Sequence, residues 1–197
     1  MAFEIRKAAV LGAGVMGASI AAHLANAGIP CCLLDIVPFE LTEEDRKKGL
    51  TEKSPQWRNR FAVNGLENVR KSKPASFYAP AKAAMVKPGN FEDHLGWLAD
   101  ADLVIEAVVE NLKIKQDLFA KVAKVVSPGA IVATNTSGIR IRDISANFGK
   151  ELKQRFLGIP FFNPPRYMKL VEVIPGEATK EEDVAFVSRF CEDVLGK

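Results

Sequence analysis

The sequence has 197 residues, of which 48% are hydrophobic and 26% charged, so it can bury one sizeable core or one domain with the start of another. Its formal net charge of +3 is too small and too scattered to indicate a nucleic-acid partner. No run reaches the roughly 18 continuous apolar residues that a membrane helix needs, so we predict no membrane span and a cytoplasmic location.

Short apolar runs alternate with helical stretches along the chain. We predict strands at 7–12, 29–35, 102–108, 130–135, 155–162 and 168–174. Helices are expected at 15–27 and 112–126, and a final helix at 179–197 with Thr179 as a possible cap. Continuous rather than alternating apolar runs are typical of strands buried on both faces. The order strand, helix, strand therefore predicts an α/β fold with a doubly wound, mostly parallel sheet.

A glycine-rich segment follows the first strand directly and opens the first helix. It consists of Gly12, Ala13, Gly14, Val15, Met16 and Gly17. In this context Gly12 makes a tight turn, Gly14 lets the backbone approach a pyrophosphate, and Gly17 lets the helix pack closely on the sheet. Asp35 ends the second strand, where a carboxylate accepts hydrogen bonds from a ribose and repels a 2′-phosphate. The sequence therefore predicts a Rossmann-type domain that binds NAD rather than NADP.

The segment from about 40 to 95 is too long for a simple crossover and is rich in charge. Nine Lys or Arg residues stand against two Glu residues between positions 46 and 73. We expect a helical insertion here, which is either a solvated helical hairpin or a surface for ligand phosphates.

Cysteine and histidine residues give no indication of a metal site or of disulfides. Cys31, Cys32 and Cys191 are odd in number and lie in apolar runs, which favours buried thiols in a reducing compartment. His23 and His94 share no ligand spacing with them, so no metal is expected.

A second polar cluster follows the next two strands, where an open parallel sheet places its ligand. "EAVVENLKIK" provides Glu110 and Lys115, and "NTSG" provides Asn135 and Ser137. These residues have a structural alternative, because "NTS" can cap a helix and Glu110 can complement a helix dipole. From the spacing alone, both interpretations stay open.

Taken together, "GAGVMG", Asp35, "EAVVENLKIK", "NTSG" and "FFNPPRYMKLVEV" resemble the NAD-binding domain of the 3-hydroxyacyl-CoA dehydrogenases of fatty-acid β-oxidation. The resemblance covers essentially the whole chain and is nearest to bacterial multifunctional forms. It implies a helical hairpin inserted after the second strand and a separate helical domain, absent from 1–197, through which the full-length protein forms a homodimer. It implies an acyl-CoA substrate, with coenzyme A received by the basic hairpin.

The resemblance also implies roles for individual residues. Glu110, Lys115 and Asn163 contact or flank the nicotinamide end of NAD, and Ser137 hydrogen-bonds the substrate oxygen and the cofactor. In this family a histidine precedes the motif Phe-Phe-Asn-Pro and acts as the general base, and the acid of "LVEV", here Glu172, orients it. Pro160 occupies the position of that histidine and can neither accept a proton nor form the pair. We therefore expect NAD binding with little or no dehydrogenation.

Two explanations for Pro160 stay open: a substitution in an otherwise ordinary dehydrogenase, or conversion of the domain to a cofactor-binding module. The intact Glu172, Ser137, Glu110 and Asn163 favour the first. The alternative function is a free-standing NAD(H)-binding or regulatory module, which predicts a natural stop after Lys197. A 3-hydroxyisobutyrate-type dehydrogenase is a more distant alternative, which would lack "FFNPP" followed by "LVEV".

Overall fold

The computed structural model describes residues 4–197 as a seven-stranded sheet with helices on both faces. The strand order is β3-β2-β1-β4-β5-β6-β7, and all neighbouring pairs are parallel except β6 with β7. The strands are β1 (Ala8–Leu11), β2 (Cys31–Asp35), β3 (Val86–Asn90), β4 (Leu103–Glu106), β5 (Ile131–Thr134), β6 (Phe156–Gly158) and β7 (Ile174–Pro175). The predicted doubly wound, Rossmann-type architecture is confirmed.

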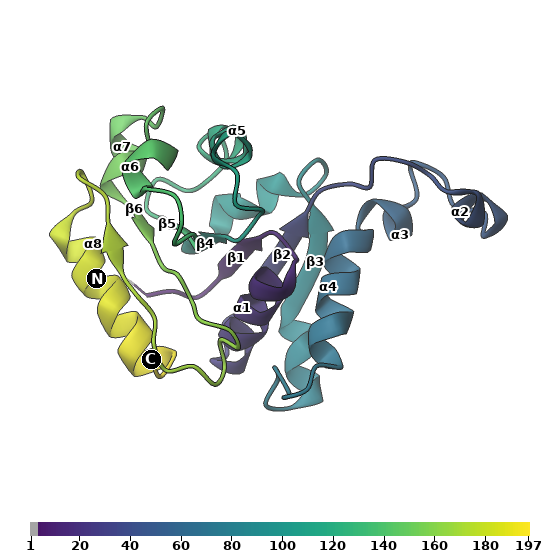
Figure 1. Ribbon diagram of the computed structural model, residues 1–197, viewed down its shortest axis with the longest axis horizontal. Helices are drawn as coiled ribbons and strands as arrows, with labels where there is room; N and C mark the ends of the chain where they lie inside the picture. Colours follow the sequence, from purple (N-terminus) through teal and green to yellow (C-terminus); the bar gives the residue numbers. More distant parts are fainter. Residues whose placement is uncertain (1–3) are drawn as a thin grey trace.

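The helices form two layers around the sheet (Figure 1). The α-helices are α1 (Val15–Asn26), α2 (Glu43–Lys47), α3 (Pro55–Arg58), α4 (Arg60–Arg70), α5 (Leu112–Val122), α6 (Ile141–Ile144), α7 (Lys150–Gln154) and α8 (Glu181–Arg189). Two 3₁₀ segments, η1 (Pro80–Met85) and η2 (Leu95–Asp100), and one π-helical segment, η3 (Phe190–Val194), complete the set. One core contains α1, α4 and α8, and the other contains α5, α6 and α7.

The central strands are apolar on both faces, as the continuous runs predict. In β1, Ala8 and Val10 belong to the core beneath α1, whereas Ala9 and Leu11 belong to the core beneath α5. Leu11 pairs with Leu34 of β2 on one side and with Glu106 of β4 on the other. The chain leaves β1 toward β2 and leaves β4 toward β5, so an opening lies between the carboxyl ends of β1 and β4.

The expected insertion at 40–95 is helical at α2, α3 and α4, but it also contains β3, which the sequence did not reveal. Pro88 and Gly89 disfavour a strand, yet both are tolerated because β3 is the outermost strand and pairs only with β2. Figure 1 shows α2 at the end of a segment that projects away from the sheet. Arg58 holds the base of this segment through Glu92 and Asp93, at 2.7 and 2.6 Å.

The predicted strand at 168–174 is wrong for most of its length. Only Ile174 and Pro175 form β7, and an isolated antiparallel bridge joins Val171 to Phe161. The apolar run at 168–174 lies at the edge of the sheet. In the described part of the chain, it has no further neighbouring strand with which its backbone could pair.

The predicted helix at 179–197 begins at Glu181, and Thr179 does not cap it. The Thr179 hydroxyl instead accepts from the Gly176 N–H and donates to the Phe156 carbonyl, at 2.8 and 2.6 Å.

His23 joins α1 to the end of the chain. Its Nε2 lies 3.1 Å from the Leu195 carbonyl, its Nδ1 has no hydrogen-bond partner among residues 4–197, and its ring meets Phe161 edge-on. Burial, together with the charges of Lys197 and Arg166, lowers the pKa of His23 from 6.5 to about 4, against the opposing effect of the Leu195 carbonyl. The folded chain therefore holds this ring in its neutral form.

We predict that acid weakens the fold through His23. Because the folded-state pKa is lower than the unfolded value, the unfolded chain binds the extra proton, and stability is lost as the pH falls from about 6.5 to about 4. The full loss is about 3 kcal/mol. Urea unfolding of the wild type and of His23→Gln across this range measures it. A glutamine variant with the same pH dependence would contradict the assignment.

Candidate functional site

The glycine-rich turn at the carboxyl end of β1 has the conformation that its sequence predicts. Gly12 has a φ of +104°, and a β-carbon there would lie 2.5 Å from the Ala107 carbonyl oxygen. A β-carbon on Gly17 would lie 1.8 Å from the Gly12 oxygen. At Gly14 the space is open, with no atom within 4 Å of a β-carbon. The three glycines therefore serve a tight turn, close packing and an unobstructed approach to the backbone.

The first turn of α1 leaves its amide groups available to an anion. Gly14 is the N-cap residue and supplies no side-chain cap, and the first intrahelical bond runs from the Ala18 N–H to the Gly14 carbonyl at 3.0 Å. The N–H groups of Val15, Met16 and Gly17 consequently have no helical partner. A pyrophosphate fits here, because the amides and the helix dipole both favour negative charge.

Asp35 ends β2 beside this turn, as predicted, and makes a contact that the sequence did not indicate. Its Oδ2 accepts the Ala13 N–H at 2.6 Å, and its Oδ1 accepts the Ile36 N–H at 2.7 Å. The carboxylate is half-buried and fixed by these two bonds. Each oxygen retains capacity for a further hydrogen bond, which is what a ribose diol requires.

A buried ion pair lies on the other side of the opening. Lys115 Nζ contacts Glu106 Oε1 at 2.7 Å, and both side chains are almost completely buried. Glu106 also accepts from the Val108 N–H at 2.7 Å and from the Thr134 hydroxyl at 2.6 Å. From its place at the end of an apolar strand, Glu106 is expected to face the cofactor together with Glu110 and Lys115, but the structure buries its side chain completely.

Lys115 connects this buried pair to Glu110. Its Nζ lies 3.3 Å from Glu110 Oε2, while Glu110 Oε1 accepts from the Thr136 hydroxyl and, at 3.1 Å, from the Gly138 N–H. Burial raises the pKa of Glu110, but the Thr136 hydrogen bond and the Lys115 charge outweigh it and lower that pKa below its usual value. Glu110 is about half-exposed and Lys115 is buried, so Lys115 acts on the cleft through Glu110.

Asn135 and Ser137 follow β5 and take different positions. Asn135 Oδ1 accepts the Phe161 N–H at 2.8 Å, so it ties the end of β5 to the segment after β6. Ser137 is exposed beside Glu110, whose carboxylate binds the neighbouring Gly138. Ser137 thus lies between Thr136 and Gly138, which both hydrogen-bond to Glu110, and Asn135 makes an internal hydrogen bond.

Pro160 and Glu172 lie opposite each other. The Glu172 N–H donates to the Pro160 carbonyl at 3.4 Å, next to the bridge between Phe161 and Val171. Pro160 is buried and the Glu172 side chain is exposed. The two positions are therefore neighbours, but Glu172 is not the buried strand residue that the apolar run suggested.

A cavity of about 690 Å³ extends from the phosphate-binding turn along α1 and α4 to the segment that follows β6. Gly14 and Asp35 line one end, and Asn163 and Pro164 line the other. Asn64, Asn68 and Ser72 contribute amide and hydroxyl groups to its α4 wall. The cavity thus connects Asn163 with the predicted cofactor turn.

Arg166 fastens the segment after β6 to the segment after α4. Its Nη1 donates to the carbonyls of Ala75 and Phe77 at 2.6 and 3.0 Å, and its guanidinium lies over the rings of Tyr78 and Tyr167. No sequence pattern indicates this contact, which joins residues about 90 positions apart.

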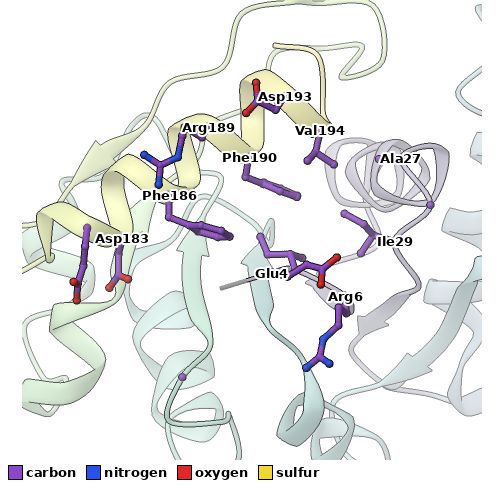
Figure 2. Close-up of a pocket in the computed structure, with 14 residues that line it drawn as sticks. Glu4, Arg6, Ala27, Ile29, Asp183, Phe186, Arg189, Phe190, Asp193 and Val194 are labelled. Carbon is purple, nitrogen blue, oxygen red and sulfur yellow. The ribbon is translucent and has the colours of Figure 1, made fainter. Parts of the chain in front are cut away.

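A separate cavity of about 960 Å³ lies at the amino ends of β1 and β2, beneath α8 (Figure 2). Phe186 and Phe190 point into it from α8 and η3, and Glu4 and Ile29 lie opposite them. None of the predicted site residues lines this cavity.

Within residues 4–197, no group of three or more His, Cys, Asp or Glu side chains is arranged to hold a metal ion. The same part of the chain contains no helix with the length and apolar character needed to cross a membrane.

Comparison with known proteins identifies one family. The family model described as "3-hydroxyacyl-CoA dehydrogenase, NAD binding domain" matches residues 7–197. A "Probable 3-hydroxyacyl-CoA dehydrogenase" of Bacillus subtilis is 48% identical over 194 residues, and a protein of the same description from Deinococcus radiodurans is 46% identical. Both alignments cover 98% of this chain, but only 25% and 52% of the relatives. The chain thus spans about a quarter to a half of their length.

A solved structure has the same fold. The crystal structure of 3-hydroxybutyryl-CoA dehydrogenase from Escherichia coli K12 aligns with a TM-score of 0.70 and 32% identity. The alignment covers 98% of this chain and 37% of that one.

We predict that Lys115→Met destabilises the fold by about 3–5 kcal/mol, because it leaves the Glu106 carboxylate buried without its cation. Chemical denaturation measures the loss. Lys113→Met, which removes an exposed lysine paired with Asp117, should change stability by no more than about 0.5 kcal/mol. Adding Glu106→Gln to Lys115→Met should restore part of the stability. Equal effects at positions 113 and 115 would contradict this account.

Proposed function

This chain belongs to the 3-hydroxyacyl-CoA dehydrogenase family as its NAD-binding domain, and on that premise we propose that it supplies the cofactor half of an enzyme that oxidises (S)-3-hydroxyacyl-CoA to 3-oxoacyl-CoA in fatty-acid β-oxidation. The observation that carries the proposal is the uncapped start of α1 beside Asp35, at the point where the strand order reverses.

In this proposal the dinucleotide lies across the carboxyl ends of the strands. The amides of Val15, Met16 and Gly17 bind the pyrophosphate, and Asp35 binds the adenosine ribose. The nicotinamide end lies toward Glu110, Ser137 and Asn163. Glu110 supports this role, because it is partly exposed and its hydrogen bonds fix its orientation.

The acyl-CoA occupies the part of the cavity between α4 and the segment after β6, and the dinucleotide occupies the Gly14 and Asp35 end of the same cavity. The pantetheine arm contains amides and a hydroxyl, which match the side chains of Asn64, Asn68 and Ser72. Lys73 lines the same cavity and offers a cation to a phosphate of coenzyme A.

Several arginines of the basic insertion pair with acidic side chains, so less positive charge is available to a ligand than the number of Lys and Arg residues suggests. Arg58 pairs with Glu92 and Asp93, Arg60 with Asp45, and Arg70 with Glu67. These arginines hold the insertion together, which leaves Lys73 as the basic side chain that the cavity itself exposes to a ligand.

The reaction needs a base for the hydroxyl proton of the substrate. NAD⁺ held by the first amides of α1 and by Asp35 would supply the acceptor for the hydride on C3. Ser137 is available to hydrogen-bond the reacting oxygen, and Glu172 lies beside position 160, where it could orient an imidazole. Pro160 provides no basic nitrogen, and losing a positioned base commonly lowers the rate about 10²–10⁴-fold. We therefore propose that this chain binds NAD but is impaired in dehydrogenation.

Pro160 also favours a second candidate function, a free-standing NAD(H)-binding or regulatory module without dehydrogenase activity. The retention of Glu172 beside position 160, and of Ser137 beside Glu110, favours the impaired dehydrogenase.

We propose that a helical domain beyond 1–197 completes the substrate side and forms a homodimer in the full-length protein. Its support is a set of half-exposed large apolar side chains on the segment after β6. They are Phe162, Tyr167, Met168 and Leu170.

Three free buried cysteines support a reducing, cytoplasmic location.

We predict that NADH binds more tightly than NADPH, because Asp35 repels a 2′-phosphate. Asp35→Ala should weaken NADH binding about tenfold or more while NADPH affinity changes less. Fluorescence titration measures both affinities. Asp100→Ala removes an exposed acid that pairs with Lys7 near the amino ends of β1 and β4, and it serves as the control. Equal affinities of the wild type for NADH and NADPH would contradict the role of Asp35.

We predict that Pro160→His raises the rate of acetoacetyl-CoA reduction by NADH about 10²–10⁴-fold in the full-length protein. The wild type should turn over far below the ordinary range of about 1–10³ per second. Pro80→His, an exposed change on η1, should have no effect. Unchanged turnover despite NADH binding would favour the module, and ordinary wild-type turnover would refute the impairment.

A further inference from the structure

The crossover helix α4 contacts the phosphate-binding turn through a glycine. Its buried face consists of the small residues Ala62 and Gly65 together with Val69. A β-carbon on Gly65 would lie 2.3 Å from the Ala13 carbonyl oxygen and 3.0 Å from the Ala13 β-carbon. Glycine is a poor residue for the middle of a helix, so its presence in α4 needs a reason, and the approach to Ala13 provides one.

The contact falls on a residue whose backbone N–H already has a partner. The Ala13 N–H donates to Asp35 Oδ2 at 2.6 Å, and the Ala13 side chain is 6% exposed. The residue that follows is Gly14, the N-cap of α1. The position of Ala13 is therefore fixed between Asp35 and α4, and it determines where the first amides of α1 point.

We infer that Gly65 is a positioning residue for the dinucleotide, because it lets α4 lie directly on Ala13 and so holds the phosphate-binding turn in its binding geometry. This inference deepens the proposed function and rests on it. Gly65 lies far outside the glycine motif in sequence, and the nearest atoms to a β-carbon on it belong to Ala13.

The same contact sets the distance between the two ligand sites. Asn64 and Asn68 lie on α4 and form a wall of the cavity whose one end Gly14 lines. Because α4 packs directly on Ala13, a shift of the glycine-rich turn would also shift the α4 wall of the cavity. A β-carbon at position 65 would move one or both.

The test is the affinity of Gly65→Ala for NADH, measured by calorimetry at a temperature where circular dichroism shows the variant folded. We expect the dissociation constant to rise about tenfold, the effect of losing one hydrogen bond to a charged group. Gly96→Ala is the matched control, because a β-carbon there meets no atom within 4 Å, and it should bind NADH like the wild type. A folded Gly65→Ala that binds NADH with wild-type affinity overturns the inference, whatever its melting temperature.

A second measurement needs no variant. In the wild-type chain, NADH should slow hydrogen exchange of the amides on the buried face of α4, at Ala62, Gly65 and Val69, and leave those of α8 unchanged. Unchanged exchange in α4 on saturation with NADH overturns the inference. A wild type that binds no NADH at all refutes the proposed function instead, so the two failures are distinguishable.

Discussion

Contact between main-chain atoms at the phosphate-binding turn constrains the rest of this domain. Gly17 lies against the carbonyl of Gly12, and Gly12 lies against Ala107, so closely that a β-carbon at either glycine would overlap backbone atoms. These contacts join α1 to β1 and β1 to the chain leaving β4. The opening between the two strands therefore has a fixed width, and the amides of α1 and the carboxylate of Asp35 face it from positions that the backbone determines.

The carboxylates on the two sides of this opening are stabilised by different partners. On the β2 side, Asp35 is half-buried and accepts backbone N–H groups. On the β4 side, Glu106 is completely buried and requires the ammonium of Lys115, supported by Thr134. Burying two charges has a large desolvation cost, which the ion pair and its hydrogen bonds offset. The buried pair fixes Glu110, which remains exposed enough to meet a ligand.

The fold and the proposed reaction make different demands on the residue at position 160. Pro160 is buried after β6, and its carbonyl accepts the Glu172 N–H across the antiparallel bridge. Packing at this point needs only a compact side chain and a carbonyl. In the proposed reaction, proton transfer needs an imidazole, and His23 does not provide it, because it lies within α1 with its Nε2 directed at Leu195. Under that proposal, the backbone pairing around position 160 is kept although the basic group is not.

The glycine turn, the acid at the end of β2 and the doubly wound order of the elements could be predicted from the sequence, because their determinants are local. The predictions for 86–90 and 168–174 were wrong, because strand pairing there outweighs local preference: Pro88 and Gly89 form a strand by pairing with β2, and most of 168–174 has no strand within residues 4–197 to pair with. The contacts of Gly65 with Ala13, Lys115 with Glu106 and Arg166 with Phe77 depend on the folded arrangement. Each joins residues that belong to different elements, and a linear pattern carries no information about which elements fold against each other.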